Sequence, residues 1–384
     1  SHIDSHLLKS PHVQVSKAWR NVIVYSDVWR IVFLRRLRSS SLWQEIASAV
    51  NFRRPTTTCG WKRAFSAFAH DAHQLEHRWR SGSATRHDIN CHGDGIYCLQ
   101  YDQEKIVSGN RDDTVKVWNI KTRELEFQMA GHQGSVLCLQ YDEHKVITAS
   151  SDHTIRVWDL ATHACRTVLR EHSDSVLHVR FLGDTMVSCS KDRTILVWQR
   201  TDEFGFTWSS KRRLTGHIAA VNVVEFDEHF IVSASGDRTI RLWSLETGEC
   251  VKILRTHTRG IACLQYRYPF IASGSSDETI CIYDIERDRK LHDLTGHEAL
   301  VRCVRFNEEF VVSGSYDGSV RVWDFKTGSL LSRLVGHSHR VFRVQFDHLR
   351  IISSSQDDTI IIWDFYGDLK DKHELTYDQP LAIM

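Results

Sequence analysis

Several features that would assign a chain of 384 residues to a compartment or a chemistry are missing. There is no CxxC pair and no Asn-x-Ser/Thr sequon, and no uncharged apolar run approaches the ~18 residues that a membrane span requires. The formal net charge is +1, which argues against a protein that binds nucleic acid in bulk. We therefore expect neither a membrane nor nucleic acid among its partners.

Residue sets that carry catalysis are also missing. Outside the repeated segments described below, no nucleophile stands with a base, no metal-ligand set is complete and no glycine-rich loop could cradle a phosphate. His70 and His73 form an H-x-x-H pair, but no cysteine or carboxylate pattern completes it as a metal site. We expect a non-catalytic protein with no cofactor and no metal.

The ten cysteines lie mostly in segments that have the pattern of strands, as Cys98, Cys138, Cys263 and Cys303 do. Without pairing motifs they are interpreted as reduced, buried, small apolar residues. That interpretation predicts a reducing compartment, and we expect the cytoplasm and the nucleus.

What the chain does have is a repeat with a period of ~40 residues. Each repeat holds a histidine, an aspartate twenty residues later, a serine or threonine four before the aspartate, and an aromatic six after it. The histidine and aspartate pairs are His92 and Asp112, His132 and Asp152, His172 and Asp192, His217 and Asp237, His257 and Asp277, His297 and Asp317, and His337 and Asp357. Gly-His near the start and Trp-Asp near the end make this the WD40 propeller signature.

The repeat predicts an all-β, seven-bladed WD40 propeller. Segments such as residues 136–141 and 154–158 are rich in β-branched and aromatic residues and are bounded by turn residues. The last repeat ends after its third strand, so residues 84–91 are expected to supply the fourth strand and to close the ring. The histidines and aspartates are interpreted as structural, because seven identical sets relay hydrogen bonds through a sheet and are not seven catalytic triads.

One repeat is longer than the others, because Trp198 and Trp243 are forty-five residues apart. Phe204, Phe206 and Trp208 lie in the insertion. We expect it on the outer side of the ring, with its aromatics packing on strands and not forming a second docking site.

The first eighty-five residues have helical spacing, with apolar positions such as Trp29 and Phe33, then Trp43, then Trp61. Residues 15–20 (Val-Ser-Lys-Ala-Trp-Arg) and 27–30 (Asp-Val-Trp-Arg) resemble the second half of an F-box, a helical module that docks on the Skp-cullin ubiquitin-ligase core. The chain opens without methionine and the usual start of the module is absent, so we expect a fragment or an incomplete gene model. The predicted domains are a truncated F-box (1–45), a helical linker (46–83), the propeller (84–368) and a polar tail (369–384).

Function in a propeller is expected in the loops over the central channel. Three positions recur there in every repeat: the residue before the aspartate, and the third and the fifth residues after the histidine. These positions are Arg111, Ser151, Lys191, Gly236, Ser276, Tyr316 and Gln356; Gly95, Ser135, Ser175, Ala220, Gly260, Leu300 and Arg340; and Tyr97, Leu137, Leu177, Asn222, Ala262, Arg302 and Phe342. They include four cations and no acid, and Arg259 adds a fifth cation. A one-signed patch of this kind favours an anionic ligand, and arginine beside hydroxyl groups suits phosphate.

Several stretches resemble the beta-transducin repeat-containing proteins, among them Gly95-Ile-Tyr-Cys-Leu-Gln-Tyr-Asp102 and Arg259-Gly-Ile-Ala-Cys-Leu-Gln-Tyr-Arg267. The likeness covers all seven repeats and the helical linker. That family comprises substrate receptors of Skp-cullin-F-box ligases, which recognise Asp-Ser-Gly-x-x-Ser degrons phosphorylated on both serines. The resemblance implies that Tyr97, Arg111, Ser135 and Ser151 hold the first phosphoserine, that Arg259, Gly260 and Ser276 hold the second, that Tyr316 with Arg302 takes the aspartate, and that Lys191, Asn222, Gly236, Leu300 and Arg340 line the same mouth.

The predicted function is therefore that of a substrate-recognition subunit of such a ligase, with phosphorylated proteins and a Skp-type adaptor and cullin complex as partners. Because the F-box is incomplete, a second hypothesis for the function stays open, namely a phosphopeptide-binding scaffold without ligase coupling. Two plainer interpretations also stand beside the site prediction. The basic residues could be ordinary solvated charges, and Tyr97 and Tyr316 could be packing aromatics.

Overall fold

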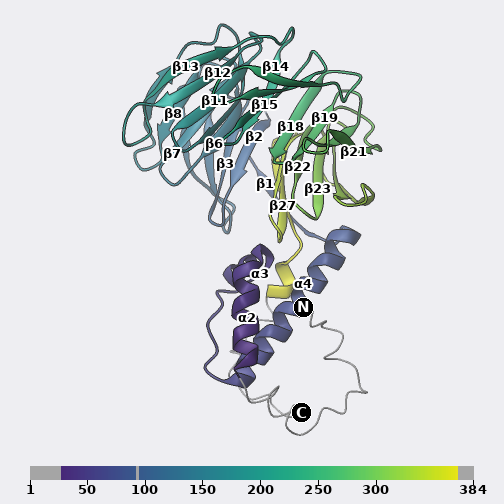
Figure 1. Ribbon diagram of the computed structural model, residues 1–384. Helices are drawn as coiled ribbons and strands as arrows, with labels where there is room; N and C mark the ends of the chain where they lie inside the picture. The colour runs from purple at the N-terminus through teal and green to yellow at the C-terminus, as the bar shows by residue number, and fades with distance from the viewer. Residues whose placement is uncertain (1–26, 92–94, 371–384) are drawn as a thin grey trace. The chain divides into compact units, whose positions relative to one another are not determined.

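The computed structural model describes residues 27–91 and 95–370. Its contacts divide these residues into a helical unit, which ends at Arg78 and includes the residues from Phe365 onward, and a propeller unit, Trp79–Asp364 (Figure 1). Residues 365–370 thus group with the helices and not with the propeller. The predicted F-box segment at 15–20, His92 and most of the polar tail lie outside the described residues.

The helical unit is built around aromatic side chains at helical spacing. Its helices are α2 (Val28–Ser39), α3 (Ser41–Ala49), most of α4 (Thr58–Ser81) and the short α5 (Gly367–Lys370). Phe33 is fully buried, and its ring lies 5.0–5.6 Å from those of Trp43, Trp61 and Phe68. Ser40 accepts a hydrogen bond from the Trp43 backbone N–H at 3.4 Å and caps α3. None of the described helices has the length and apolar character that a membrane span needs.

The last turn of α4 belongs to the propeller unit. The Trp79 ring stacks on Phe310 at 4.9 Å, and its indole N–H donates to the His348 carbonyl at 2.9 Å. Trp79 is only 2% exposed, so its side chain is part of the packing of the propeller unit, between blades 6 and 7.

The propeller contains seven four-stranded antiparallel sheets, as the repeat predicted. Blade 1 holds β2 (Ile96–Tyr101), β3 (Lys105–Asn110), β4 (Val115–Asn119) and β5 (Leu125–Met129); blade 2 holds β6 (Val136–Tyr141), β7 (Lys145–Ser150), β8 (Ile155–Asp159) and β9 (Cys165–Leu169); blade 3 holds β10 (Val176–Leu182), β11 (Thr185–Ser190), β12 (Ile195–Arg200) and β13 (Trp208–Leu214); blade 4 holds β14 (Val221–Phe226), β15 (Phe230–Ser235), β16 (Ile240–Ser244) and β17 (Cys250–Leu254). Blade 5 holds β18 (Ile261–Arg267), β19 (Phe270–Ser275), β20 (Ile280–Asp284) and β21 (Arg289–Leu294); blade 6 holds β22 (Val301–Phe306), β23 (Phe310–Ser315), β24 (Ser319–Asp324) and β25 (Leu330–Val335); blade 7 holds β26 (Val341–Phe346), β27 (Arg350–Ser355), β28 (Thr359–Asp364) and β1 (Thr85–Asn90).

The ring closes through strand β1, which pairs antiparallel with β28 and places Ile89 opposite Ile360. The predicted closing strand is confirmed. Blade 7 therefore contains residues from both ends of the propeller, and its third strand has a partner instead of an exposed edge. In blade 3 the insertion connects β12 to the outermost strand β13, as expected, but Trp208 is already part of β13 and is 6% exposed.

The repeated polar side chains form the predicted hydrogen-bond relay in blades 2–7. The histidine Nδ1 lies 2.7–3.2 Å from the aspartate carboxylate, and Nε2 lies 2.7–2.9 Å from the serine or threonine hydroxyl. Because a carboxylate only accepts, the Nδ1–H donates to it and Nε2 accepts from the hydroxyl. Except in blade 5, an indole N–H donates to the same hydroxyl at 2.8–3.0 Å, and Trp118 makes the equivalent bond to Ser108 in blade 1.

Blade 5 departs from the expected set, since Tyr283 replaces the tryptophan. Its phenol hydroxyl donates to Asp288 and not to Ser273. The phenol O–H projects beyond the ring and overshoots the hydroxyl that an indole N–H reaches from its side. The relay in this blade therefore ends at Ser273, which still bonds to His257 at 2.9 Å.

These relays predict a specific loss of stability in acid. Burial would raise the pKa of the Asp237 carboxyl, but hydrogen bonds from Thr239 and His217 outweigh it and lower the pKa from 3.8 to about 2. Burial also lowers the pKa of His217 from 6.5. The unfolded chain binds both protons more readily, so this stabilisation is present above pH ~6.5 and is lost as the pH falls toward ~2.

An Asp237→Asn substitution tests this contribution. We expect it to lower the free energy of unfolding at pH 7 by roughly 2 kcal/mol and to flatten the pH dependence between about pH 4 and pH 2. Urea denaturation at pH 7 and between about pH 4 and pH 2 measures both effects. Asp113→Asn is the matched control, because Asp113 has no side-chain partner among the described residues. A pH profile of Asp237→Asn that equals the wild-type profile would contradict the assignment.

Candidate functional site

The inner strand of every blade contains a β-bulge at the same position. In blade 1 the register shifts between Ile96 and Cys98, so Tyr97 is the extra residue, and the other six inner strands shift at the equivalent place. The bulged residues are the fifth after each histidine: Tyr97, Leu137, Leu177, Asn222, Ala262, Arg302 and Phe342. A bulge re-aims a side chain, which explains why all seven line one cavity.

The other two recurring positions meet through the backbone. In each blade the N–H of the residue before the aspartate donates to the carbonyl of the third residue after the histidine, at 2.9–3.0 Å. In blade 1 this bond joins Arg111 to Gly95, and in blade 6 it joins Tyr316 to Leu300. The three sets of residues therefore lie at one end of the blades, at the mouth of the central channel.

The residues predicted for the first phosphoserine are contiguous across blades 1 and 2. The Ser135 hydroxyl donates to the Arg111 carbonyl at 3.0 Å, and the Ser151 N–H donates to the Ser135 carbonyl at 3.0 Å. Gly134 is needed here, because a Cβ at this position would lie 2.6 Å from the Ser151 Oγ. The Ser135 hydroxyl thus joins the two loops, and the Arg111 and Ser151 side chains on them are donors that suit an oxyanion.

The residues predicted for the second phosphoserine are held by a close approach of two backbones. A Cβ on Gly260 would lie 3.3 Å from the Cα of Gly236 in the preceding blade. The Ser276 N–H donates to the Gly260 carbonyl at 3.0 Å, and Arg259 adjoins Gly260 in the same loop. Small residues at 236 and 260 therefore keep this part of the mouth open beside the Arg259 guanidinium.

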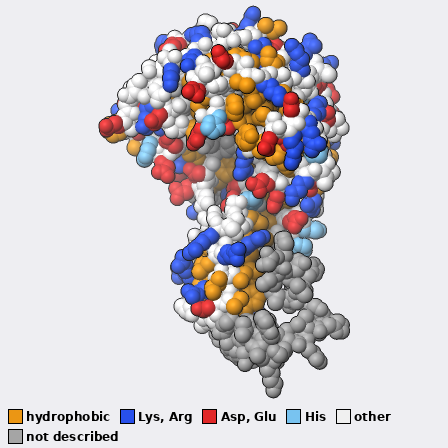
Figure 2. All heavy atoms as spheres, in the orientation of Figure 1, with side chains coloured by type: hydrophobic (Ala, Val, Ile, Leu, Met, Phe, Trp, Pro, Cys, Tyr) orange, Lys and Arg blue, Asp and Glu red, His pale blue; other side chains and the backbone are white. Residues whose placement is uncertain are grey.

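The basic side chains of the mouth are free to meet a ligand. Arg111, Lys191, Arg259 and Arg340 are exposed, and none of them forms an ion pair with a carboxylate in the described part of the chain. Elsewhere on the propeller, basic and acidic side chains are interspersed on the face that Figure 2 shows, and pairs such as Arg166 with Asp159 lie 2.6 Å apart. These four side chains therefore present unpaired positive charge at the mouth.

An aromatic corner borders the mouth between blades 6, 7 and 1. The Phe342 ring lies 4.9 Å from that of Tyr97 and 5.9 Å from that of Tyr316, and the Arg340 guanidinium lies 4.8 Å from the Tyr316 ring centre. Phe342 occupies one of the recurring mouth positions, but the family resemblance gave it no role. The contacts show that it supports both predicted tyrosines, so packing is part of what these aromatics do.

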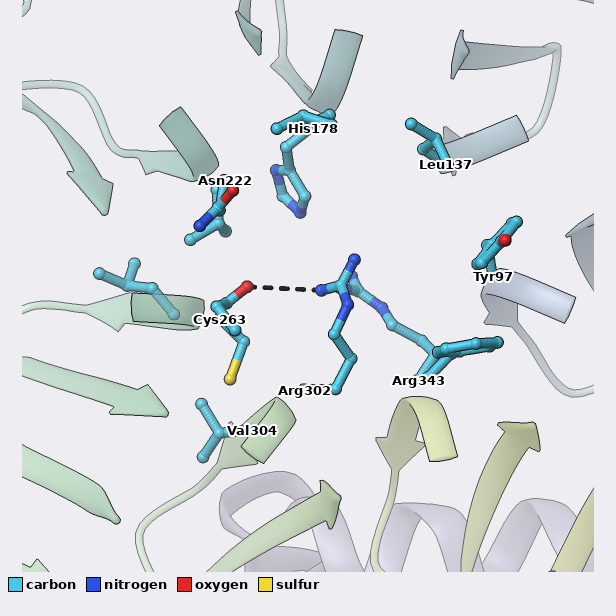
Figure 3. A pocket seen from close by; sticks show the side chains of 13 residues that line it. Tyr97, Leu137, His178, Asn222, Cys263, Arg302, Val304 and Arg343 are labelled. Atoms are coloured by element: carbon cyan, nitrogen blue, oxygen red, sulfur yellow. Dashed lines mark hydrogen bonds between the residues drawn. The ribbon is translucent and has the colours of Figure 1, made fainter. Parts of the chain in front are cut away.

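Behind the mouth lies a small cavity that opens to solvent (Figure 3). Arg302 and Asn222 both reach into its wall, where they donate to the Ala262 carbonyl at 3.4 Å and to the Ile261 carbonyl at 2.7 Å. Tyr97 stands on the opposite side of the view. The predicted residues Tyr97, Asn222 and Arg302 thus face one space although they belong to blades 1, 4 and 6.

A ring of polar side chains occupies the eighth position after each histidine, farther along the inner strands. Four members are glutamines whose side chains hydrogen-bond to the backbone of a neighbouring blade. The Gln100 side chain, for example, accepts from the Tyr141 N–H at 2.9 Å and donates to the Tyr141 carbonyl at 3.1 Å. The other three are charged: Arg180 and Arg305 lie 3.3 and 3.1 Å from the Glu225 carboxylate. Sequence reasoning missed this triad, although a comparison of the eighth positions would have found three charged residues among glutamines.

The fold and this mouth define a WD40 repeat protein, and the family model described as WD domain, G-beta repeat matches seven segments: residues 83–119, 123–159, 163–199, 208–244, 248–284, 288–324 and 328–364. The chain belongs to the WD40 repeat family. It is similar to F-box/WD repeat-containing protein lin-23 of Caenorhabditis elegans, with 42% identity over 35% of this chain and 25% of that protein. It is also similar to F-box and WD repeat domain-containing 11-A of Danio rerio, with 44% identity over 35% of this chain and 26% of that protein.

Other similarities are to an SCF subunit and to a solved propeller. A 32% identical stretch covers 16% of this chain and 10% of the probable E3 ubiquitin ligase complex SCF subunit scon-2 of Neurospora crassa. The crystal structure of the computationally designed Ika8 protein superimposes with a TM-score of 0.59 at 31% identity, over 70% of this chain and 83% of that one. The matched regions span about a quarter or less of each of these three natural relatives, so the activities of those whole proteins are not established for this chain.

Proposed function

We propose that this protein is the substrate-recognition subunit of a Skp-cullin-F-box ubiquitin ligase, a member of the beta-transducin repeat-containing group, and that it binds doubly phosphorylated Asp-Ser-Gly-x-x-Ser degrons at the channel mouth. One observation carries the proposal: the exposed arginines of the mouth have no carboxylate partner among the described residues, and their loops are bonded to serine residues of the same mouth. Cations in that state favour a multiply charged anion. The similarity to F-box/WD repeat proteins supports the ligase assignment.

Phosphorylation would act as the switch for binding. Each phosphate carries about −1.5 to −2 charges at neutral pH and offers several acceptor oxygens. Tyr97, Arg111, Ser135 and Ser151 would take the first phosphate, and Arg259, Gly260 and Ser276 would take the second. An unmodified serine would satisfy neither arginine, and each lost charge-assisted bond would weaken binding by roughly 1.5–3 kcal/mol.

The receptor would supply position and would form or break no bond. Bound substrate would be held near a ubiquitin-charged enzyme, which raises its effective concentration there. A Skp-type adaptor and a cullin would be the assembly partners, and the free thiols of all ten cysteines suit the cytoplasm and the nucleus. The second candidate is a phosphopeptide-binding scaffold without ligase coupling, which the same mouth would serve.

A pull-down from cell extract separates these two functions. With the chain as bait, we expect phosphorylated client proteins together with Skp-type and cullin components, because one receptor would bind both. Phosphatase treatment of the extract should remove the clients and leave the ligase components, since only clients bind through phosphate. Clients without ligase components would favour the scaffold, and clients that survive phosphatase would contradict the phosphate-dependent site.

A further inference from the structure

Beneath the mouth, the channel wall departs from its own repeat at the sixth position after the histidine. Four blades place a buried cysteine there, and the thiols lie 3.5–3.6 Å from backbone carbonyls of the same or the next blade: Cys98, Cys138, Cys263 and Cys303. Blade 4 places Val223 at this position. Blades 3 and 7 instead place His178 and Arg343. Two large polar side chains thus stand where the repeat otherwise has small or apolar ones.

Both of these side chains reach the cavity without bonding partners. His178 is 4% exposed, and neither of its ring nitrogens forms a hydrogen bond with the described residues. The Nε of Arg343 is likewise buried and unbonded. Figure 3 shows the His178 ring and the guanidinium groups of Arg302 and Arg343 extending toward the same central space. Arg302 donates to the Ala262 carbonyl at 3.4 Å, but His178 and the Arg343 Nε have no such bond. Buried polar groups are normally satisfied, so these two side chains indicate a ligand that is itself polar.

The net charge of the side chains around this cavity indicates that the ligand is an anion. Arg180 and Arg305 share Glu225, whereas Arg302 and Arg343 pair with no carboxylate in the described ranges. Four guanidinium groups and one carboxylate leave an excess of three positive charges. Burial, followed by the charges of Arg305 and Arg180, lowers the pKa of Arg343 to about 9. The positive charges in the wall therefore repel one another, and a bound anion would reduce this repulsion.

We propose that this cavity binds a small inorganic oxyanion of the phosphate class, held by Arg302, Arg343 and His178. A tetrahedral phosphate has acceptor oxygens for both guanidinium groups and for an imidazole N–H, and its charge offsets most of the excess. These three residues lie on the strands of the channel wall. The arginines assigned to the two phosphoserines lie instead in the mouth loops, but Tyr97 lines the same cavity, and the resemblance gives Arg302 to the aspartate of the degron. The proposed site therefore adjoins the peptide site, and its test is made without peptide.

The test uses the full chain without peptide, titrated with inorganic phosphate against chloride at equal ionic strength. Calorimetry and the thermal midpoint report binding. We expect saturable stabilisation of the wild type by phosphate, with affinity reduced roughly tenfold or more by Arg343→Met or by Arg302→Met. Arg123→Met is the control, because Arg123 is exposed in the turn between β4 and β5 and should leave the phosphate response unchanged. No response of the wild type to phosphate would overturn the proposal.

Two further results distinguish this site from the mouth and from misfolding. If Arg111→Gln removes the phosphate response while Arg343→Met keeps it, the ion binds at the mouth and the proposed site is wrong. Because Arg343→Met removes one of the excess charges, this variant should be at least as stable as the wild type in chloride alone. A lower thermal midpoint in chloride would show that Arg343 is a stabilising residue of the wall and would contradict the proposed site.

Discussion

An Arg111→Glu variant is expected to lose binding to a doubly phosphorylated Asp-Ser-Gly-x-x-Ser peptide by about 100-fold or more. Arg111 is exposed at the mouth, and its loop is bonded through the Arg111 carbonyl to Ser135, which in turn bonds to Ser151. Two charge-assisted bonds to phosphate at roughly 1.5–3 kcal/mol each account for a loss of this size, and the new carboxylate adds repulsion. Fluorescence anisotropy with a labelled peptide measures the affinity.

The conformation of the Arg111 loop should not change in this variant, because the hydrogen bonds of Arg111 involve its backbone N–H and carbonyl. The Arg111 N–H donates to the Gly95 carbonyl, and the Arg111 carbonyl accepts from Ser135. Lys121→Glu makes the same change of charge in the turn between β4 and β5, at the other end of β4, and should bind the peptide as the wild type does. Unchanged affinity of Arg111→Glu, or an equal loss in Lys121→Glu, would overturn the placement of the first phosphoserine.

The architecture of the propeller was predictable because its signal is repeated. A period of ~40 residues fixed the number of blades, and the incomplete last repeat pointed to residues 84–91 as the closing strand, which pairs with β28. Single positions were less predictable. Tyr283 occupies the place of a tryptophan by spacing, yet its hydroxyl bonds to Asp288, because spacing cannot say how far a side chain extends. Trp208 was assigned to an insertion but begins β13, because the longer spacing shows that residues are added and does not show where the next strand starts.

The positions of the mouth could be found by comparing repeats, but their geometry could not. Strand alternation places successive side chains on opposite faces, and only the bulge at Tyr97 and its six equivalents turns the fifth position toward the channel. A comparison of the eighth positions would have found Arg305 and Glu225, but it would not have shown that they form an ion pair across two blades. The sequence therefore shows which residue stands at each repeat position. It does not show the strand register that brings these residues together.

An Arg259→Ala variant is expected to separate the two phosphate positions. Its guanidinium lies in the blade 5 loop with Gly260 and Ser276, whereas the first phosphoserine is assigned to blades 1 and 2. An extended peptide advances ~3.3 Å per residue, so serines four residues apart are separated by roughly 13 Å and reach different blades. The variant should bind the doubly phosphorylated peptide roughly 10- to 100-fold more weakly than the wild type does. It should bind a peptide phosphorylated only on the first serine almost as the wild type does.

The comparison is a thermodynamic cycle, in which removal of the arginine and removal of the second phosphate are measured singly and together by anisotropy. If Arg259 contacts the second phosphate, the two losses do not add, since either change alone removes the same bonds. Arg111→Ala is the matched reference, because it should respond to loss of the first phosphate and not of the second. Equal weakening of both peptides by Arg259→Ala would mean that the mouth acts as one diffuse positive field, which attracts any phosphopeptide but does not distinguish two phosphates.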